Sequence, residues 1–123
     1  MQLGERFAHA LAAKDADGLR GLLAPALDFR AMTPGRFWEA NGSVAVIDDI
    51  LLGQWFEPSD DIKEVISVET GAVGRRHRVG YCFRVENPDG RYLVEQQAYY
   101  EHDGARITWL RVICAGFQAI DGN

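Results

Sequence analysis

The sequence has little cysteine and no close pair of cysteines. Cys82 and Cys114 lie far apart in the 123 residues, without the CxxC spacing or the histidine cluster of a zinc site. The three histidines, His9, His77 and His102, have no metal-ligand spacing among themselves. We therefore expect two free thiols in a reducing compartment, and neither a metal ion nor another cofactor.

Long apolar stretches and basic runs are also scarce. The segment Met1–Arg6 already contains charged residues, and no apolar stretch has the length that a signal peptide or a membrane-spanning helix needs. The 13 Lys and Arg are outnumbered by 18 Asp and Glu, which gives a net charge of -5 at pH 7. Such a chain repels a phosphate backbone on average. We expect a cytoplasmic protein that binds neither nucleic acid nor membranes.

The composition is that of an ordinary globular domain. Apolar residues make up 47% of the chain and charged residues 25%, which disfavours disorder, collagen and coiled coil. A chain of this length falls in the range of about 100–150 residues that is typical of one domain. We expect a single domain over residues 1–123, with a core that needs no disulfide.

The first third of the chain has helical periodicity. Phe7 and Leu11 belong to an apolar stripe that predicts a helix over about 2–14. The segment Asp15–Gly18 supplies a break and an N-cap for a short second helix, which Pro25 ends.

The next segment predicts a strand, a loop and a helix. Leu27–Thr33 is short and bounded by prolines, as in a strand, and Pro34–Arg36 begins a loop that carries Trp38. A third helix is expected from Gly42 to Pro58, on the spacing of its apolar residues.

After Pro58 the apolar period changes from 3.6 to 2. Turn clusters, of which Asn87–Gly90 is the strongest hairpin signal, separate four segments rich in Val, Ile, Tyr, Phe and Trp. These segments, 62–70, 77–86, 91–100 and 106–117, predict an antiparallel meander. Helices segregated from such strands indicate an α+β fold, with three N-terminal helices packed on a curved antiparallel sheet.

The ordered set of local motifs resembles a known superfamily. Its carriers are Ala13–Leu19, Leu22–Pro25, Asp28–Gly35 and Asp103–Ile107. Together with the element order, they resemble the nuclear transport factor 2-like superfamily, which includes ketosteroid isomerase and the SnoaL-like polyketide cyclases. The resemblance covers nearly the whole chain. It implies a cone-shaped α+β barrel with a pocket between helices and sheet, and in many members dimerisation through the sheet.

The resemblance also implies catalytic positions, which here carry other residues. The isomerase's tyrosine on the first helix falls at Phe7, and its carboxylate base falls at Ala31 or Thr33. The buried carboxylic acid of its oxyanion hole falls at Gln96 or Gln97, which keep a hydrogen-bond donor but lose the acid. The isomerase mechanism therefore lacks its carboxylates in this sequence.

The position of the catalytic aspartate in the SnoaL-like cyclases also has no acidic residue in this sequence. SnoaL-like cyclases keep an aspartate near the end of the last strand, where this chain has the segment 112–116. We therefore expect a small-molecule-binding protein with a hydrophobic pocket. The alternative is a lyase, isomerase or hydrolase that acts on a hydrophobic cyclic substrate.

Aromatic side chains are the candidate pocket walls, and a hydrophobic or aromatic small molecule is the expected ligand. Phe7, Trp38 and Trp55 could line the pocket, with Trp38 as a lid on its predicted loop. Tyr81 and Tyr99 could donate a phenolic hydrogen bond to a ligand oxygen. The alternative is that these residues are only core or dimer contacts.

Polar candidates complete the set. Alternation along a strand sends Gln96 and Gln97 to opposite faces, and the inward one could orient a ligand together with Thr33 and Cys114. Arg30 could hold a ligand carboxylate. Its alternative role is to pair with a nearby aspartate on the same strand.

His77 is the candidate base of the enzyme alternative, with Tyr81 and either Gln96 or Gln97 polarising an oxygen. It stands in the basic run Arg75–Arg78, which could equally be a solvated strand edge. A homodimer through the sheet is also expected, because Trp109, Arg111 and Ile113 alternate onto one face of the last strand.

Overall fold

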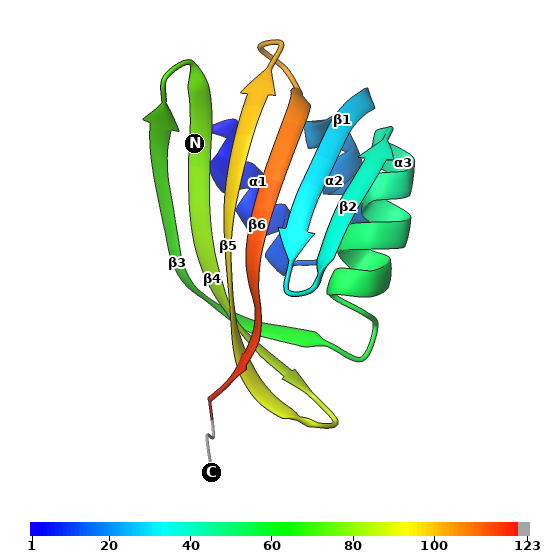
Figure 1. Cartoon of the computed structure of the whole chain (residues 1–123), viewed down its shortest axis with the longest axis vertical. Helices are drawn as coiled ribbons and strands as arrows, with labels where there is room; N and C mark the ends of the chain where they lie inside the picture. The colour runs from blue at the N-terminus through cyan, green and yellow to red at the C-terminus, as the bar shows by residue number, and fades with distance from the viewer. Residues whose placement is uncertain (121–123) are drawn as a thin grey trace.

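A computed structural model describes residues 1–120 as helices packed on one face of a single curved sheet (Figure 1). The helices are α1 (Leu3–Ala12), α2 (Ala16–Leu22) and α3 (Ser43–Ala45), which continues directly as the π-helix η1 (Val46–Trp55). The strands are β1 (Leu23–Thr33), β2 (Arg36–Asn41), β3 (Asp61–Val73), β4 (Arg76–Asn87), β5 (Gly90–His102) and β6 (Ile107–Ala119).

The six strands lie in the order β2-β1-β6-β5-β4-β3. The predicted α+β architecture and the meander from β3 to β6 are confirmed. The pairing of β1 with β6 is parallel, so the sheet is mixed rather than antiparallel throughout. This pairing places the first and the last strand side by side in the middle of the sheet.

Local sequence signals fix the first two helices. The Asp15 side chain caps α2 by accepting a hydrogen bond of 2.9 Å from the Gly18 N–H. The N-terminus of α1 lies directly against β5, because the Gly4 N–H donates to the Tyr100 hydroxyl at 2.9 Å. A Cβ at Gly4 would stand 2.7 Å from the Tyr100 ring, so only glycine permits this approach.

The prediction that Trp38 lies on a loop is wrong, because residues 36–41 form the strand β2. Pro34 and Gly35, the latter with φ 76°, make the turn that folds β2 back antiparallel to β1. Trp38 is a buried strand residue and not a lid on a loop. The second helix also ends earlier than expected, since β1 already begins at Leu23.

The third predicted helix exists, but most of it is π-helical. Its buried residues recur every four to five positions; they are Val46, Ile47, Ile50, Leu51 and Trp55. The Phe56 N–H donates to the Leu51 carbonyl five residues back, at 3.0 Å. This spacing brings Trp55, at the end of η1, into the core beside β1 and β2.

The helices cover one face of the sheet, here called the inner face, and the opposite face is the outer face (Figure 1). The core lies between the helices and the inner face; its largest members include Phe7, Phe29, Phe56, Tyr81, Phe83 and Tyr100. Over the described part of the chain, no helix is long and apolar enough to cross a membrane.

Candidate functional site

The alternation of burial along β5 decides which glutamine faces inward. Gln96 is 1% exposed and lies between the buried residues Val94 and Ala98 on the inner face. Gln97 lies on the outer face, where its Oε1 accepts a hydrogen bond of 2.8 Å from Arg78. Gln96 is therefore the glutamine that faces the helices.

Three polar side chains form a row across the inner face. Tyr81 on β4 is the register partner of Gln96 on β5, and Gln96 is the register partner of Cys114 on β6. The Tyr81 hydroxyl donates a hydrogen bond of 2.6 Å to the Gln96 Oε1. We call Tyr81, Gln96 and Cys114 the polar row.

Two further polar groups lie at the β6 end of the row. On β1, Thr33 accepts a hydrogen bond of 2.8 Å from the Trp38 indole Nε1 through its Oγ1. Thr33, Trp38 and Cys114 line the same depression, which we call the inner depression; its volume is about 190 Å³. Its lining residues are Thr33, Trp38, Gln54, Trp55, Cys114, Gly116 and Phe117.

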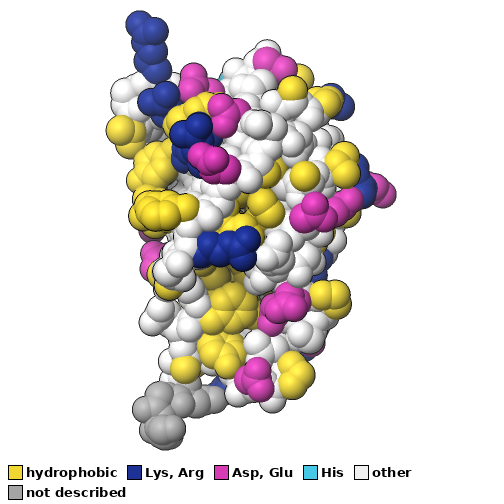
Figure 2. Space-filling view, turned by 45° about the vertical axis from the view of Figure 1, so that its right-hand side comes forward, with side chains coloured by type: hydrophobic (Ala, Val, Ile, Leu, Met, Phe, Trp, Pro, Cys, Tyr) yellow, Lys and Arg dark blue, Asp and Glu magenta, His cyan; other side chains and the backbone are white. Residues whose placement is uncertain are grey.

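Tryptophan and phenylalanine rings form the walls on the helix side. The Trp55 ring meets Trp38 edge to face at 5.9 Å and lies 5.8 Å from the Phe29 ring. At the rim, the Arg36 guanidinium lies 3.5 Å from the centre of the Trp38 ring. The space-filling view, turned by 45° from Figure 1 so that the side of β2 and η1 comes forward, shows hydrophobic side chains down the middle of the molecule with charged groups around them (Figure 2).

Two buried hydrogen-bond donors of this region have no partner among the described residues. They are the Gln96 Nε2 and the Trp55 Nε1; Gln96 is 1% exposed and Trp55 is 7% exposed. An unpaired buried polar group costs about 1–3 kcal/mol. Both atoms donate, so the group that would satisfy them is an acceptor, such as the oxygen of a ligand or a water molecule.

Burial also fixes the protonation state of Tyr81. It raises the pKa of Tyr81 well above its ordinary value, and the neighbouring Cys114 adds to the rise. Tyr81 is therefore a neutral phenol at physiological pH and acts as a hydrogen-bond donor, not as an ionised base. The residues that line the inner depression include no Asp, Glu, Lys or Arg.

Phe7 reaches the polar row from α1. Its ring meets Tyr81 edge to face at 6.2 Å, so it packs against the phenol where the isomerase pattern would have a second tyrosine. The inner face thus brings together seven of the residues singled out from the sequence; they are Phe7, Thr33, Trp38, Trp55, Tyr81, Gln96 and Cys114.

His77 is separated from the polar row. Although it is in phase with Tyr81, it lies four residues away along β4, a distance of about 13 Å at the usual rise of a strand. Its ring stacks on Tyr100 at 5.2 Å and on His102 at 4.9 Å. The structure therefore does not bring His77 together with Tyr81 and Gln96.

Arg30, Gln97 and Tyr99 lie on the outer face instead of in the pocket. Arg30 pairs with Glu39 on β2 at 3.3 Å, and not with the aspartate on its own strand. That aspartate, Asp28, pairs with Arg111 of β6 at 3.1 Å. The sequence interpretation chose the wrong partner because it could not place β2 and β6 beside β1.

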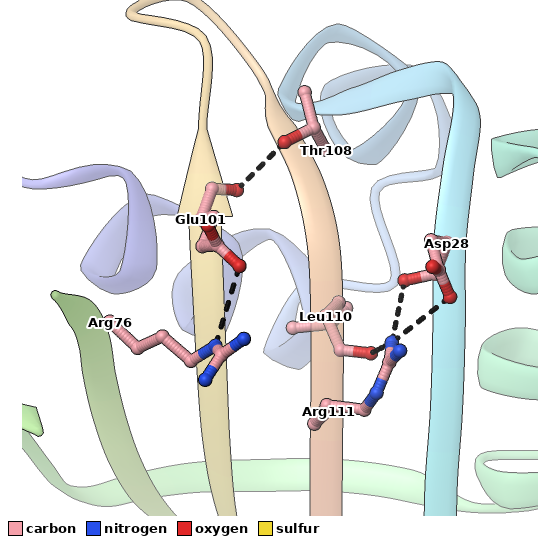
Figure 3. A network of polar contacts seen from close by, with 6 residues as sticks. All are labelled: Asp28, Arg76, Glu101, Thr108, Leu110 and Arg111. Atoms are coloured by element: carbon pink, nitrogen blue, oxygen red, sulfur yellow. Dashed lines mark hydrogen bonds and ion pairs between the residues drawn. The ribbon is translucent and has the colours of Figure 1, made fainter.

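A polar network holds the outer face together (Figure 3). The Arg111 guanidinium bonds the Asp28 carboxylate and the main-chain carbonyls of Asp28 and Leu110 (Figure 3). Arg111 and Arg76 both lie over the Trp109 ring, at 4.3 and 4.1 Å, and Arg76 also pairs with Glu101 at 3.3 Å.

Beside this network is an open depression of about 400 Å³ on the outer face of β1, β2 and β6. Three of its lining residues are exposed hydrophobic side chains, Met32, Phe37 and Ile113. Arg30 and Arg111 stand at its edge. Within residues 1–120, no cluster of three or more His, Cys, Asp or Glu could hold a metal ion.

Solved structures share this architecture at low sequence identity. A candidate polyketide cyclase from Xanthomonas campestris pv. campestris is 16% identical, with a TM-score of 0.69 over 90% of this chain and 86% of that one. A candidate SnoaL-like polyketide cyclase from Mesorhizobium loti is 17% identical, with a TM-score of 0.57 over 89% of this chain and 94% of that one. The chain has the nuclear transport factor 2-like fold.

An LEH-like epoxide hydrolase from M. tuberculosis also has this fold. It is 18% identical, with a TM-score of 0.64 over 91% of this chain and 79% of that chain. Neither a protein-family model nor a curated protein matches the sequence. The likeness therefore identifies the fold, and the function must be argued from the residues of the site.

Proposed function

We propose that this nuclear transport factor 2-like domain binds a small apolar molecule in the inner depression. The observation that carries the proposal is the unpartnered buried Nε1 of Trp55, a residue that lines the depression. A second unpartnered buried donor, the Gln96 Nε2, belongs to the register partner of Cys114, which also lines it. Because neither donor is charged and no cation lines the depression, the matching ligand group is a neutral acceptor, such as a ketone or ether oxygen. The rings of Trp38 and Trp55 would contact its apolar part.

The second candidate is a lyase, isomerase or hydrolase that acts on a hydrophobic cyclic substrate. The shared fold of a candidate polyketide cyclase and an LEH-like epoxide hydrolase favours it. In such an enzyme Tyr81 and Gln96 would polarise a substrate oxygen. The inner depression supplies no carboxylate for proton abstraction, so binding without turnover is the better supported function.

We also propose that the protein is a homodimer joined through the outer face of the sheet. The exposed side chains of Met32, Phe37 and Ile113 gather there, and clustered apolar exposure is typical of interfaces. The adjacent cations Arg30 and Arg111 are each paired with a carboxylate, so the patch presents little net charge that would repel a second copy.

We also propose that the protein is located in the cytoplasm.

The ligand proposal is tested with cyclohexanone as the probe and ¹⁵N-labelled protein. The ketone should shift the side-chain amide resonances of Gln96 and the indole N–H resonance of Trp55 in a saturable way. Matched controls lie on the outer face: the Gln97 amide and the Trp109 indole should stay in place. Cyclohexanecarboxylate, an anion of similar shape, should bind at least about tenfold more weakly, because the residues that line the depression include no cation.

The outcome that overturns the proposal is equally specific. Shifts confined to Gln97 and Trp109, or no saturable shift at Gln96 and Trp55 with the ketone, would exclude the inner depression as its binding site. Stronger binding of the carboxylate than of the ketone would show that the ligand class is wrong.

A further inference from the structure

Cys114 is the one nucleophilic side chain of the polar row. It lines the inner depression and lies next to Gln96 across the β5–β6 ladder. The other cysteine, Cys82, is the register partner of Glu95, on the outer face. Burial raises the pKa of the Cys82 thiol, and the Glu95 carboxylate adds to the rise. The two thiols thus lie on opposite faces of the sheet.

The main chain just after Cys114 places an N–H group beside the Cys114 sulfur. A β-bulge in β6 gives Gly116 a φ of 85°, and the Gly116 N–H donates to the Cys114 Sγ at 3.3 Å. A Cβ at Gly116 would stand 3.0 Å from the Pro34 ring, so glycine is needed for both conformation and space. The Cys114 Sγ therefore has a main-chain N–H donor beside it.

An independent observation points to a ligand at the same place. The Gln96 Nε2, in the residue directly across the ladder from Cys114, is buried and has no partner. The Trp55 Nε1, in a side chain that lines the same depression as Cys114, is also unpartnered. A nucleophile beside two neutral donors matches an electrophile that carries a carbonyl oxygen.

We propose that Cys114 captures α,β-unsaturated carbonyl compounds by conjugate addition, an inference that rests on the ligand-binding function proposed above. The carbonyl oxygen accepts from the Gln96 Nε2 or the Trp55 Nε1. The sulfur then forms a bond with the β-carbon, and the π electrons of the C=C bond move toward the oxygen as an enolate. The proton released by the thiol ends on the α-carbon. The product is a saturated thioether ketone, and the step needs no oxidant, reductant or other reactant.

The experiment compares the two cysteines within the native protein. The protein is treated with 2-cyclohexenone, and the labelling rates at Cys114 and Cys82 are measured by peptide mass spectrometry. Methyl methanethiosulfonate, a small reagent without a carbonyl group, is used in parallel to correct for the access and ionisation of each thiol. We expect the ratio of the enone rate to the thiosulfonate rate to be at least about tenfold higher at Cys114 than at Cys82.

Substitutions test the part played by the amide. Gln96→Leu should lower the rate ratio at Cys114 about tenfold, whereas the matched Gln97→Leu on the outer face should leave it unchanged. Equal ratios at the two cysteines of the native protein, or an unchanged ratio in folded Gln96→Leu, would overturn the proposal. If either result is found while cyclohexanone still shifts the Gln96 and Trp55 resonances of the native protein, reversible binding is supported and only the covalent capture is excluded.

Discussion

The Tyr81 hydroxyl donates a hydrogen bond of 2.6 Å to the Oε1 of Gln96 at the centre of the inner face. Because this bond occupies the oxygen of the amide, the Nε2 is the end that has no protein partner. The direction of this hydrogen bond therefore leaves the Gln96 Nε2 available as a hydrogen-bond donor to a ligand. With the bond reversed, the same glutamine would offer an acceptor.

The first prediction concerns the stability of this pair. Tyr81→Phe leaves the Gln96 oxygen unpaired and should lower the free energy of unfolding by about 1–3 kcal/mol. Gln96→Leu leaves the Tyr81 hydroxyl unpaired but also removes the unpartnered Nε2, so its loss should be smaller than that of Tyr81→Phe. The double variant removes both polar groups, and its loss should be clearly smaller than the sum of the two single losses. Equilibrium urea unfolding of the four proteins measures these values.

A control for this cycle lies one residue along β5. Tyr99 and Gln97 are on the outer face, and no hydrogen bond joins their side chains in the described part of the chain, so the effects of Tyr99→Phe and Gln97→Leu should add to within about 0.5 kcal/mol. Additive losses for Tyr81 and Gln96 as well would contradict the proposed role of their hydrogen bond.

The second prediction concerns the outer face. Ile113 is 50% exposed, lines the open depression of the outer face and belongs to the proposed dimer interface. Ile113→Asp would bury an unpaired carboxylate there and should convert the dimer to a 13.7 kDa monomer, measured by sedimentation velocity at micromolar concentration. Val44→Asp, at a residue 61% exposed on α3, is the matched control and should leave the mass unchanged. A native protein that already sediments as a monomer would refute the dimer.

The third prediction concerns pH and the turn between β5 and β6. The Asp103 carboxylate accepts from the N–H groups of Arg106 at 2.8 Å and Ala105 at 2.9 Å, and these bonds lower its pKa. The native pKa lies below the unfolded value of about 3.9, so the charge of Asp103 stabilises the fold above that pH. This contribution should disappear as the pH falls through the native pKa.

Asp103→Asn isolates this effect, since the amide oxygen can still accept both hydrogen bonds but carries no charge. Thermal unfolding should show the native protein more stable than the variant at pH 6, with the difference shrinking when the pH drops below 3. A difference that is the same at both pH values would mean that the charge contributes nothing to the stability of the turn.

Much of the fold is readable from local signals. The Asn87–Gly90 turn and the period of two predict the hairpin of β4 and β5, and the caps at Asp15 and Gly42 predict where helices begin. The strand β2 escapes prediction because it is short and polar at Arg36, Glu39 and Asn41. The π-helix escapes too, because its apolar residues also fit an α-helical stripe.

The site is harder to predict than the fold. Tyr81, Gln96 and Cys114 can be named as candidates from residue type, but their alignment in one row depends on the registers of three strands. A shift of one residue in any strand would turn its side chain to the outer face. The pairing of Gln96 with Tyr81 across β4 and β5 therefore has no signature in the sequence.

The position of β6 between β1 and β5 also has a consequence for how the molecule is made. The hairpin of β1 and β2 joins the rest of the sheet only through β6, which begins at Ile107. At a synthesis rate of about 5–20 residues per second, Thr33 and Trp38 emerge from the ribosome well before the strand that will hold them beside Cys114. Until then their hairpin has no sheet to join, so a nascent chain that stops short of β6 cannot assemble the depression at all.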